Sequence, residues 1–115
     1  MAVKSLNRSW LPNIGWKHFW EAISEADTAE AAEMNGLSGL AGSVQFTGTM
    51  GGSTFVLLAS NDGTNWATIK DPAGNDISTT VAGVFEFSTS SRYIRPSASG
   101  GSSQDVDVTI IARGN

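Results

Sequence analysis

The chain has 115 residues, a formal net charge of −4 and no cysteine. A chain of this length has room for one domain, the lack of cysteine excludes disulfides and thiolate metal sites, and the acidic balance argues against nucleic acid as a partner. No apolar run approaches the length of a membrane span, and the first residues lack the apolar core of a secretion signal. We therefore expect one domain that is made in the cytoplasm and has no membrane partner.

Residues 1–15 are predicted to form an extended N-terminal arm outside the sheet, and residues 16–115 the β-sandwich domain. The arm contains Trp10, Leu11 and Ile14 among polar residues and shows no hydrophobic period. Because exposed apolar side chains invite association, we expect the arm to lie on its own domain or on a neighbouring subunit.

Charge is segregated at the start of the chain. Residues 1–20 carry three basic residues and no acid, and residues 21–33 carry five acids and no base. A basic leader and an acidic belt can dock on another copy or on a different surface, or they are two unrelated solvated segments.

The aromatic-rich segment 16–23 is consistent with a first strand. The following segment, 24–36, is ambiguous, because Ser24 suits a helix N-cap and Gly36 a C-cap, with Ala-Glu runs between them. A helix there would have little apolar surface to bury. Helix and extended chain both remain open, and we favour the extended form.

From residue 43 onward, apolar and polar residues alternate with the period of β-strands. The strand expected over 54–60 is apolar on both faces, so it is either central or covered by a partner. With turns every 8–12 residues, the whole chain holds about eight strands and predicts an all-β fold, a small jelly-roll-like antiparallel β-sandwich. The strands expected in this part are 44–50, 54–60, 66–70, 81–87, 93–99 and 106–112.

Few side chains are candidates for catalysis or for metal binding. His18 is the only histidine and lacks the usual metal-ligand companions. Asp105 and Asp107 fall on one face of a strand, where they either act as paired carboxylates or simply face water. No nucleophile elbow, phosphate loop or EF-hand is present. We expect no enzymatic activity, no metal and no cofactor.

Aromatic and guanidinium side chains form a candidate binding group. Trp66 and Tyr93 either are exposed, as suits sugar binding or a protein hot spot, or belong to the core. Arg92 and Arg95 are expected to share one strand face with Tyr93 between them, directly before Pro96.

Five motifs between Gly42 and Ile111 follow one another in a characteristic order and spacing. They are SVQFTGT at 43–49, SNDGTNW at 60–66, DPAGN at 71–75, RYIRP at 92–96 and the strand 106–111. In this order they resemble a family of small tailed-phage head proteins, the decoration or cement proteins that coat the capsid. The first forty residues match less well, since an Ala-Glu-rich stretch replaces the usual short Gly/Pro-rich entry.

The resemblance implies a structural function. Such proteins bind the outside of an assembled icosahedral head, often as trimers, and brace it against the pressure of packaged DNA. It implies the major capsid protein as partner, a homotrimer, and a place on the capsid surface of the virion. The contacts are expected from Trp10, Leu11, Ile14, Trp16, Arg92 and Arg95.

A second resemblance implies a different function. The motifs SNDGTNW and RYIR are also similar to the core hairpin of discoidin-type, galactose-binding-like jelly rolls, which bind glycans or lipid headgroups. That resemblance implies a carbohydrate-binding module of a phage tail or fibre, with Trp66 and Tyr93 near the ligand. The chain is shorter than such domains.

Overall fold

The computed structural model describes residues 2–12, 14–34 and 41–113. This part of the chain holds twelve strands, of which seven have five or more residues and five have only two or three. The short strands explain why the sequence suggested about eight. The strands are β1 (Ala2–Lys4), β2 (Asn7–Leu11), β3 (Gly15–Ile23), β4 (Asp27–Ala29), β5 (Ala32–Glu33), β6 (Ala41–Thr49), β7 (Thr54–Ser60), β8 (Ala67–Thr68), β9 (Ser78–Thr79), β10 (Gly83–Ser88), β11 (Tyr93–Ser99) and β12 (Asp105–Arg113).

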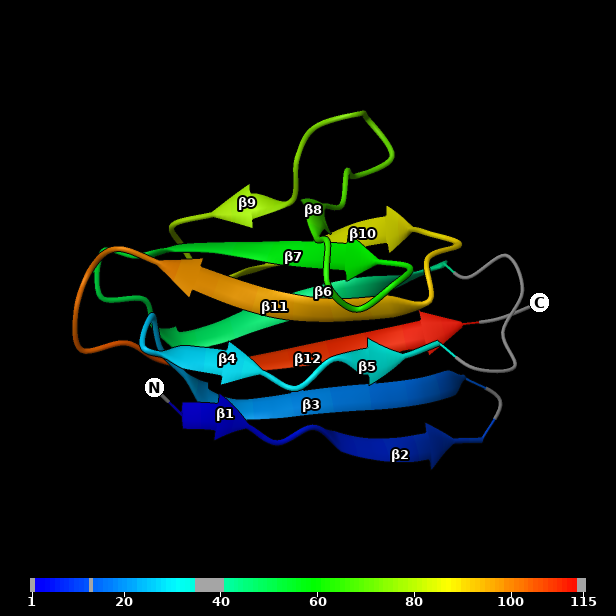
Figure 1. Ribbon diagram of the computed structural model, residues 1–115, viewed down its shortest axis with the longest axis horizontal. Helices are drawn as coiled ribbons and strands as arrows, with labels where there is room; N and C mark the ends of the chain where they lie inside the picture. The colour runs from blue at the N-terminus through cyan, green and yellow to red at the C-terminus, as the bar shows by residue number, and fades with distance from the viewer. Residues whose placement is uncertain (1, 13, 35–40, 114–115) are drawn as a thin grey trace.

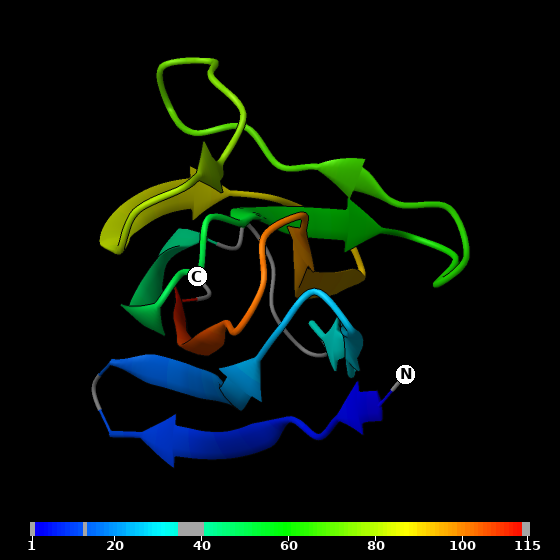
Figure 2. The same ribbon diagram turned by 90° about the vertical axis from the view of Figure 1, so that its left-hand side faces the viewer.

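Two sheets pack face to face (Figures 1 and 2). Sheet I has the order β10-β6-β12-β3-β2, and sheet II the order β5-β11-β7-β8, with β9 also paired to β7. All pairs within these two sheets are antiparallel, whereas β1 and β4 form a separate parallel pair. The structure confirms the expected all-β, antiparallel β-sandwich.

The core lies between the two sheets and follows the predicted alternation. In β12, Val106, Val108 and Ile110 are buried, and their partners across the ladder in β6 include the buried Phe46 and Val44. Directly opposed residues share a face, so one apolar layer runs across sheet I. The remaining large core side chains come from both sheets and from the β8–β9 connection: Trp20, Ile23, Phe55, Leu57, Ile69, Ile77, Phe87 and Ile94.

Strand β7 is central, which accounts for its apolar character on both faces. It pairs with β11 on one edge and with β8 and β9 on the other. Phe55 and Leu57 point into the core, while Val56 and Leu58 are half-buried on the outer face of sheet II. Of the two explanations, a central strand or a strand covered by a partner, the structure supports the central strand.

The described part of segment 24–36 is extended and contains β4 and β5, as favoured; Gly36 lies outside the described residues. The Ser24 N–H and hydroxyl both donate to the Asp27 carboxylate, and the Asp27 N–H donates back to the Ser24 carbonyl. The bond from the Ser24 N–H to the Asp27 carboxylate is one that a helix capping box would use, and here it closes a turn.

The expectation that residues 1–15 stand outside the sheet is wrong. Strand β2 forms an antiparallel ladder with β3 and is the edge strand of sheet I, and β1 pairs with β4. Bonds from the following segment hold this region in place: the Glu30 N–H donates to the Lys4 carbonyl, and the Leu6 N–H donates to the Glu30 carboxylate. Most of β2 is exposed on both faces, so no alternation marked it as a strand.

Pro96 lies in the middle of β11, opposite Leu57 of β7. The Leu57 N–H donates to the Ile77 carbonyl and the Leu57 carbonyl accepts from the Ile69 N–H, so both groups point away from β11. The Leu57–Pro96 pair is therefore a non-hydrogen-bonded one, and the nitrogen of Pro96 faces the other edge of β11. Strand β5 covers only the first two residues of that edge.

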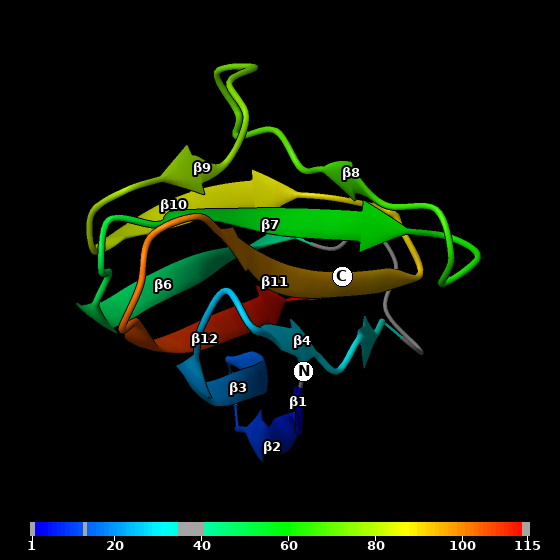
Figure 3. The ribbon, with the colours of Figure 1, turned by 60° about the vertical axis from the view of Figure 1, so that its left-hand side comes forward.

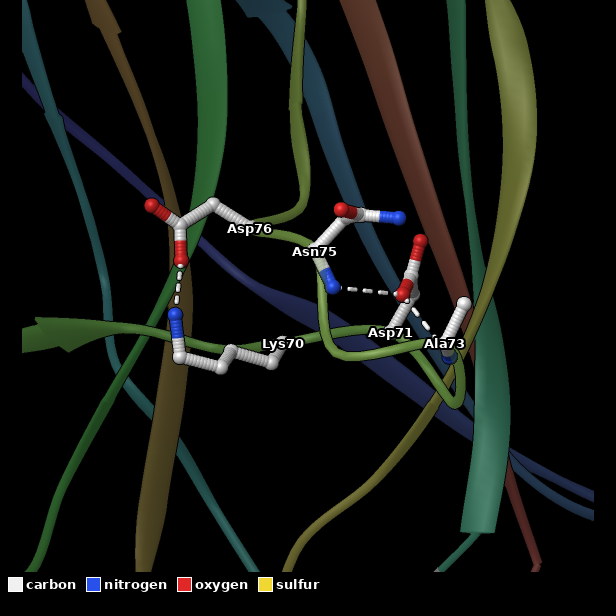
Figure 4. A network of polar contacts seen from close by, with 5 residues as sticks. All are labelled: Lys70, Asp71, Ala73, Asn75 and Asp76. Carbon is white, nitrogen blue, oxygen red and sulfur yellow. Dashed lines mark hydrogen bonds and ion pairs between the residues drawn. The ribbon is translucent and has the colours of Figure 1, made fainter.

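The connection between β8 and β9 projects from the sandwich (Figure 3). Its tip is closed by the carboxylate of Asp71, which accepts the N–H groups of Ala73 and Asn75, and its base by an ion pair of 2.7 Å between Lys70 and Asp76 (Figure 4). The motif DPAGN at 71–75 therefore forms a turn between the strands expected at 66–70 and 81–87. Within the described ranges no helix is long and apolar enough to cross a membrane.

Candidate functional surfaces

The first candidate surface is the arm edge, formed by Arg8, Trp10, Leu11, Ile14 and Trp16 at the open side of sheet I. Trp10 and Trp16 are direct partners in the β2–β3 ladder, and their rings meet edge to face at 5.3 Å. The Arg8 guanidinium stacks on the Trp16 ring at 4.2 Å. All three side chains share the face of sheet I that covers the core, where sheet II no longer covers β2.

Trp10 is 55% exposed and Ile14, in the loop between β2 and β3, is 45% exposed. Leu11 is half-buried and lies on the opposite face of the ladder from Trp10. The structure thus gathers Trp10, Trp16 and Ile14 at one hairpin but directs Leu11 to its other side. An open strand edge beside exposed aromatic surface is a surface built for contact.

His18 lies beneath the arm edge and is fully buried. Among the residues that the structure describes, neither ring nitrogen has a hydrogen-bond partner, and the ladder neighbours of His18 are Arg8 in β2 and Ile110 in β12. Burial, with a smaller contribution from the Arg8 charge, lowers the pKa of His18 to about 4. The imidazole is therefore neutral at physiological pH, and it belongs to the core layer of sheet I.

The acidic belt at 21–33 is largely used inside the chain. Asp27 binds Ser24, Glu30 binds the backbone of Leu6, and Glu33 pairs with Arg92. Glu21 and Glu25 are exposed. The belt therefore serves mainly to fasten the N-terminal strands and β11, and only two of its five acids remain for an external partner.

The second candidate surface is the Trp66 face, formed by Leu58, Trp66, Tyr93 and Arg95 on the outside of sheet II. Tyr93 and Arg95 are two residues apart in β11, and Arg95 is the ladder partner of Leu58 in β7. The Arg95 guanidinium reaches across β7 and lies 4.1 Å from the centre of the Trp66 ring, directly before β8. Trp66 and Tyr93 are half-buried, so neither belongs to the core.

Arg92 does not share the face of Arg95, contrary to expectation. It precedes β11, and a strand reverses the direction of its side chains at every residue, so positions three apart face opposite ways. Its guanidinium donates to Glu33 at 2.8 Å and lies 5.0 Å from the Tyr93 ring. The hydrogen bond that Arg92 donates to Glu33 raises the pKa of Arg92, whereas burial lowers the pKa of Arg95.

The loop between β7 and β8 borders the Trp66 face and is held by its own side chains. The Asp62 carboxylate accepts the backbone N–H groups of Thr64 and Asn65, the amide of Asn65 and the Ser60 hydroxyl. These bonds hold the pKa of Asp62 well below its usual range. Gly63 lies against the Tyr93 ring with a φ of +76°, a conformation that favours glycine.

Asp105 and Asp107 have different surroundings. Asp105 is exposed, while the Asp107 carboxylate accepts the N–H of Ala22 at 3.0 Å, at a bulge where β3 carries an extra residue opposite β12. Ala22 has a φ of +55°, which this bond helps to hold. In the described ranges, no three His, Cys, Asp or Glu side chains gather closely enough to hold a metal ion.

A cavity of about 580 Å³ lies where the projecting β8–β9 loop meets the ends of β6 and β10. Its lining includes Pro72 from the loop, Val84 and Glu86 from β10, and Arg113 from β12. It was not predicted from the sequence, because the pairing of β10, β6 and β12 and the overhang of the loop together form it. The opposite charges of Glu86 and Arg113 give it no single ligand preference.

Comparison with known proteins does not assign the chain to a family. No family model matches the sequence, and no curated protein matches it. Among solved structures, the chain is similar to the K1 cleaved adhesin domain of Lys-gingipain from Porphyromonas gingivalis W83, with 10% sequence identity and a TM-score of 0.38 over 97% of this chain and 85% of that chain. A similarity at that level says nothing about function.

Proposed function

We propose that this chain is a non-catalytic structural protein that decorates the outside of an assembled bacteriophage head. The proposal is supported by the five ordered motifs between residues 42 and 111 and by one structural observation. At the arm edge, the unpaired edge of β2 lies beside exposed Trp10 and Ile14 and the basic side chain of Arg8.

The partner in this proposal is the major capsid protein, and the contact is the arm edge. A strand edge offers backbone hydrogen bonds to an extended segment of a partner, while neighbouring apolar side chains supply burial. Trp10 is the expected anchor, since aromatic side chains dominate the energetics of protein contacts. Attachment at many equivalent positions on a shell, in trimers, adds avidity to modest single contacts.

Co-sedimentation with phage heads stripped of the protein tests the proposal. We expect the full chain to bind saturably and the variant Trp10→Ser/Ile14→Ser to bind roughly tenfold or more weakly, the loss of buried aromatic surface being worth over 1.4 kcal/mol. Val84→Ser is the matched control, because Val84 is 59% exposed but lies on β10 at the other edge of sheet I. Absence of binding by the full chain would contradict the function, and equal loss in both variants would contradict the arm edge as the anchor.

A second candidate function is carbohydrate binding. The observation that favours it is the Trp66 face, where two half-buried aromatic rings and a guanidinium lie on one side of sheet II beside a loop rich in Asn and Thr. A glycan array probed with the isolated chain tests it, and retention of glycan binding in Trp10→Ser/Ile14→Ser separates this site from the arm edge.

A further inference from the structure

In the described residues Arg95 has no acidic partner, unlike Lys70 in the β8–β9 connection and Arg92 directly before β11. Lys70 is paired with Asp76 and Arg92 with Glu33, both within 2.8 Å. In the described part of the chain, the Arg95 guanidinium has neither an ion pair nor a hydrogen bond, and its one contact of this kind is the Trp66 ring. In the same described residues, Arg8 and Lys17 of sheet I also lie against aromatic rings without an ion pair, so Arg95 is set apart by its neighbours and not by the lack of an anion alone.

The surroundings of Arg95 make that free charge effective. Burial already lowers the pKa of Arg95, so the guanidinium has lost part of its hydration while remaining charged. The contact with Trp66 restricts the guanidinium, whose N–H donors have no hydrogen-bond partner among the described residues. A planar guanidinium with free donors is suited to a carboxylate, which it can bind through two parallel hydrogen bonds.

The flanking groups are suited to a sugar ring. Arg95 lies over the Trp66 ring and Arg92 over the Tyr93 ring, so the rings border a ligand with their remaining apolar surface instead of stacking on it face to face. Such apolar surface suits the C–H groups of a pyranose. The loop from Ser60 to Asn65 is already fixed by the Asp62 carboxylate, so a ligand would not have to order it.

We infer that the Trp66 face binds a saccharide that carries a carboxylate, with Arg95 holding the carboxylate and Trp66 and Tyr93 bordering the sugar ring. This inference rests on the second proposed function, carbohydrate binding, and does not depend on capsid decoration. An acidic saccharide is favoured over a neutral one because Arg95 is the polar group of this face that the chain leaves unused.

Titration of the full chain with tetragalacturonate and, separately, with a neutral tetragalactose tests the inference, with the indole N–H signals followed by NMR. We expect the acidic tetramer to shift the Trp66 indole signal and to bind roughly tenfold or more tightly than the neutral one. Its affinity should fall as salt is added. Arg95→Gln should remove the preference, whereas the control Lys70→Gln, which also removes one positive charge, should leave it within about twofold, because Lys70 lies in the β8–β9 connection and is paired with Asp76.

The outcomes distinguish a failure of carbohydrate binding from a failure of the role given to Arg95. Equal binding of both tetramers would support carbohydrate binding but overturn the role of Arg95. Binding of neither would overturn both, and equal binding of tetraglutamate would overturn the saccharide in favour of an acidic peptide. Arg95→Lys keeps the charge without the planar fork, and a partial preference in this variant, with unchanged urea denaturation, would support the inference even if Arg95→Gln proved unstable.

Discussion

His18 is the residue that couples the stability of this sandwich to pH. It is fully buried with two unpartnered ring nitrogens, and protonation would place a second charge next to Arg8. A buried polar group without hydrogen bonds costs free energy, and a charged one costs more. The arm edge above it therefore depends on a neutral imidazole.

We expect the free energy of unfolding to decrease between pH 6.5 and pH 4 because of His18. Its pKa in the folded chain, about 4, lies below the ordinary 6.5, so the unfolded chain takes up the proton first. The contribution is fully present above pH 6.5, declines as pH falls, and levels off below about 4. A pKa change of this size corresponds to roughly 3 kcal/mol.

Urea denaturation of the native chain and of His18→Leu at pH 7, 5.5 and 4.5 measures this contribution. The leucine variant should lose stability less steeply over this range, since only the carboxylates still titrate. If the free energies of unfolding of the two proteins fell equally with pH, His18 would have a partner or a water that removes the cost of protonating it in the folded chain.

At the scale of single elements, the loop from Ser60 to Asn65 depends on one carboxylate. Asp62→Ala should speed amide hydrogen exchange at Thr64 and Asn65, whose N–H groups would lose their acceptor. Because the bonds hold the pKa of Asp62 below its ordinary value, their stabilisation is present at neutral pH and is lost only as the pH falls below the usual Asp range.

Asp71→Ala is the matched control for this experiment. Asp71 closes the β8–β9 loop through the N–H groups of Ala73 and Asn75 in the same way (Figure 4). Each variant should accelerate exchange only in its own loop. Acceleration in both loops by either change would mean that the loops are coupled through β8.

The sequence predicts those elements whose two faces differ. Strands β6 and β12 alternate because one face packs in the core and the other meets solvent, and the Asx turns at 60–66 and 71–75 are encoded by side chains that bond their own backbone. Strand β2 is exposed on both faces, so no pattern distinguishes it from an irregular arm.

Segment 24–34 shows a different limit. The bonds between Ser24 and Asp27 serve a turn as well as a helix start, so local sequence leaves the choice open. Distant contacts decide it: β4 pairs with β1, and the Trp20 indole donates to the Glu30 carbonyl. The Trp66 face has the same character, because the approach of Arg95 to Trp66 depends on the β7–β11 register.

At the scale of the whole molecule, the N-terminal strands are part of the fold. Removal of residues 1–15 would take away the β2 ladder and the β1–β4 pair and would uncover His18 and Trp16. We expect the truncated chain to unfold at a lower urea concentration than the full chain, whereas Trp10→Ser/Ile14→Ser should unfold near the native midpoint. An unchanged midpoint after truncation would show that the arm is held only weakly.

The different effects expected of the truncation and of the point variants on stability decide how the proposed capsid binding is tested. A truncation that weakens the fold would reduce binding for reasons unrelated to the contact, so point variants at exposed positions are the appropriate comparison.

The place of Pro96 bears on how sheet II ends at the β11 edge. Its nitrogen faces the side of β11 beyond the two residues that β5 pairs, and Pro96 is buried there, with β4 packed against β11. Any other residue at this position would bury an N–H group that no strand of the described chain accepts, which costs free energy. Proline removes that donor, so this edge is closed without an unsatisfied backbone group.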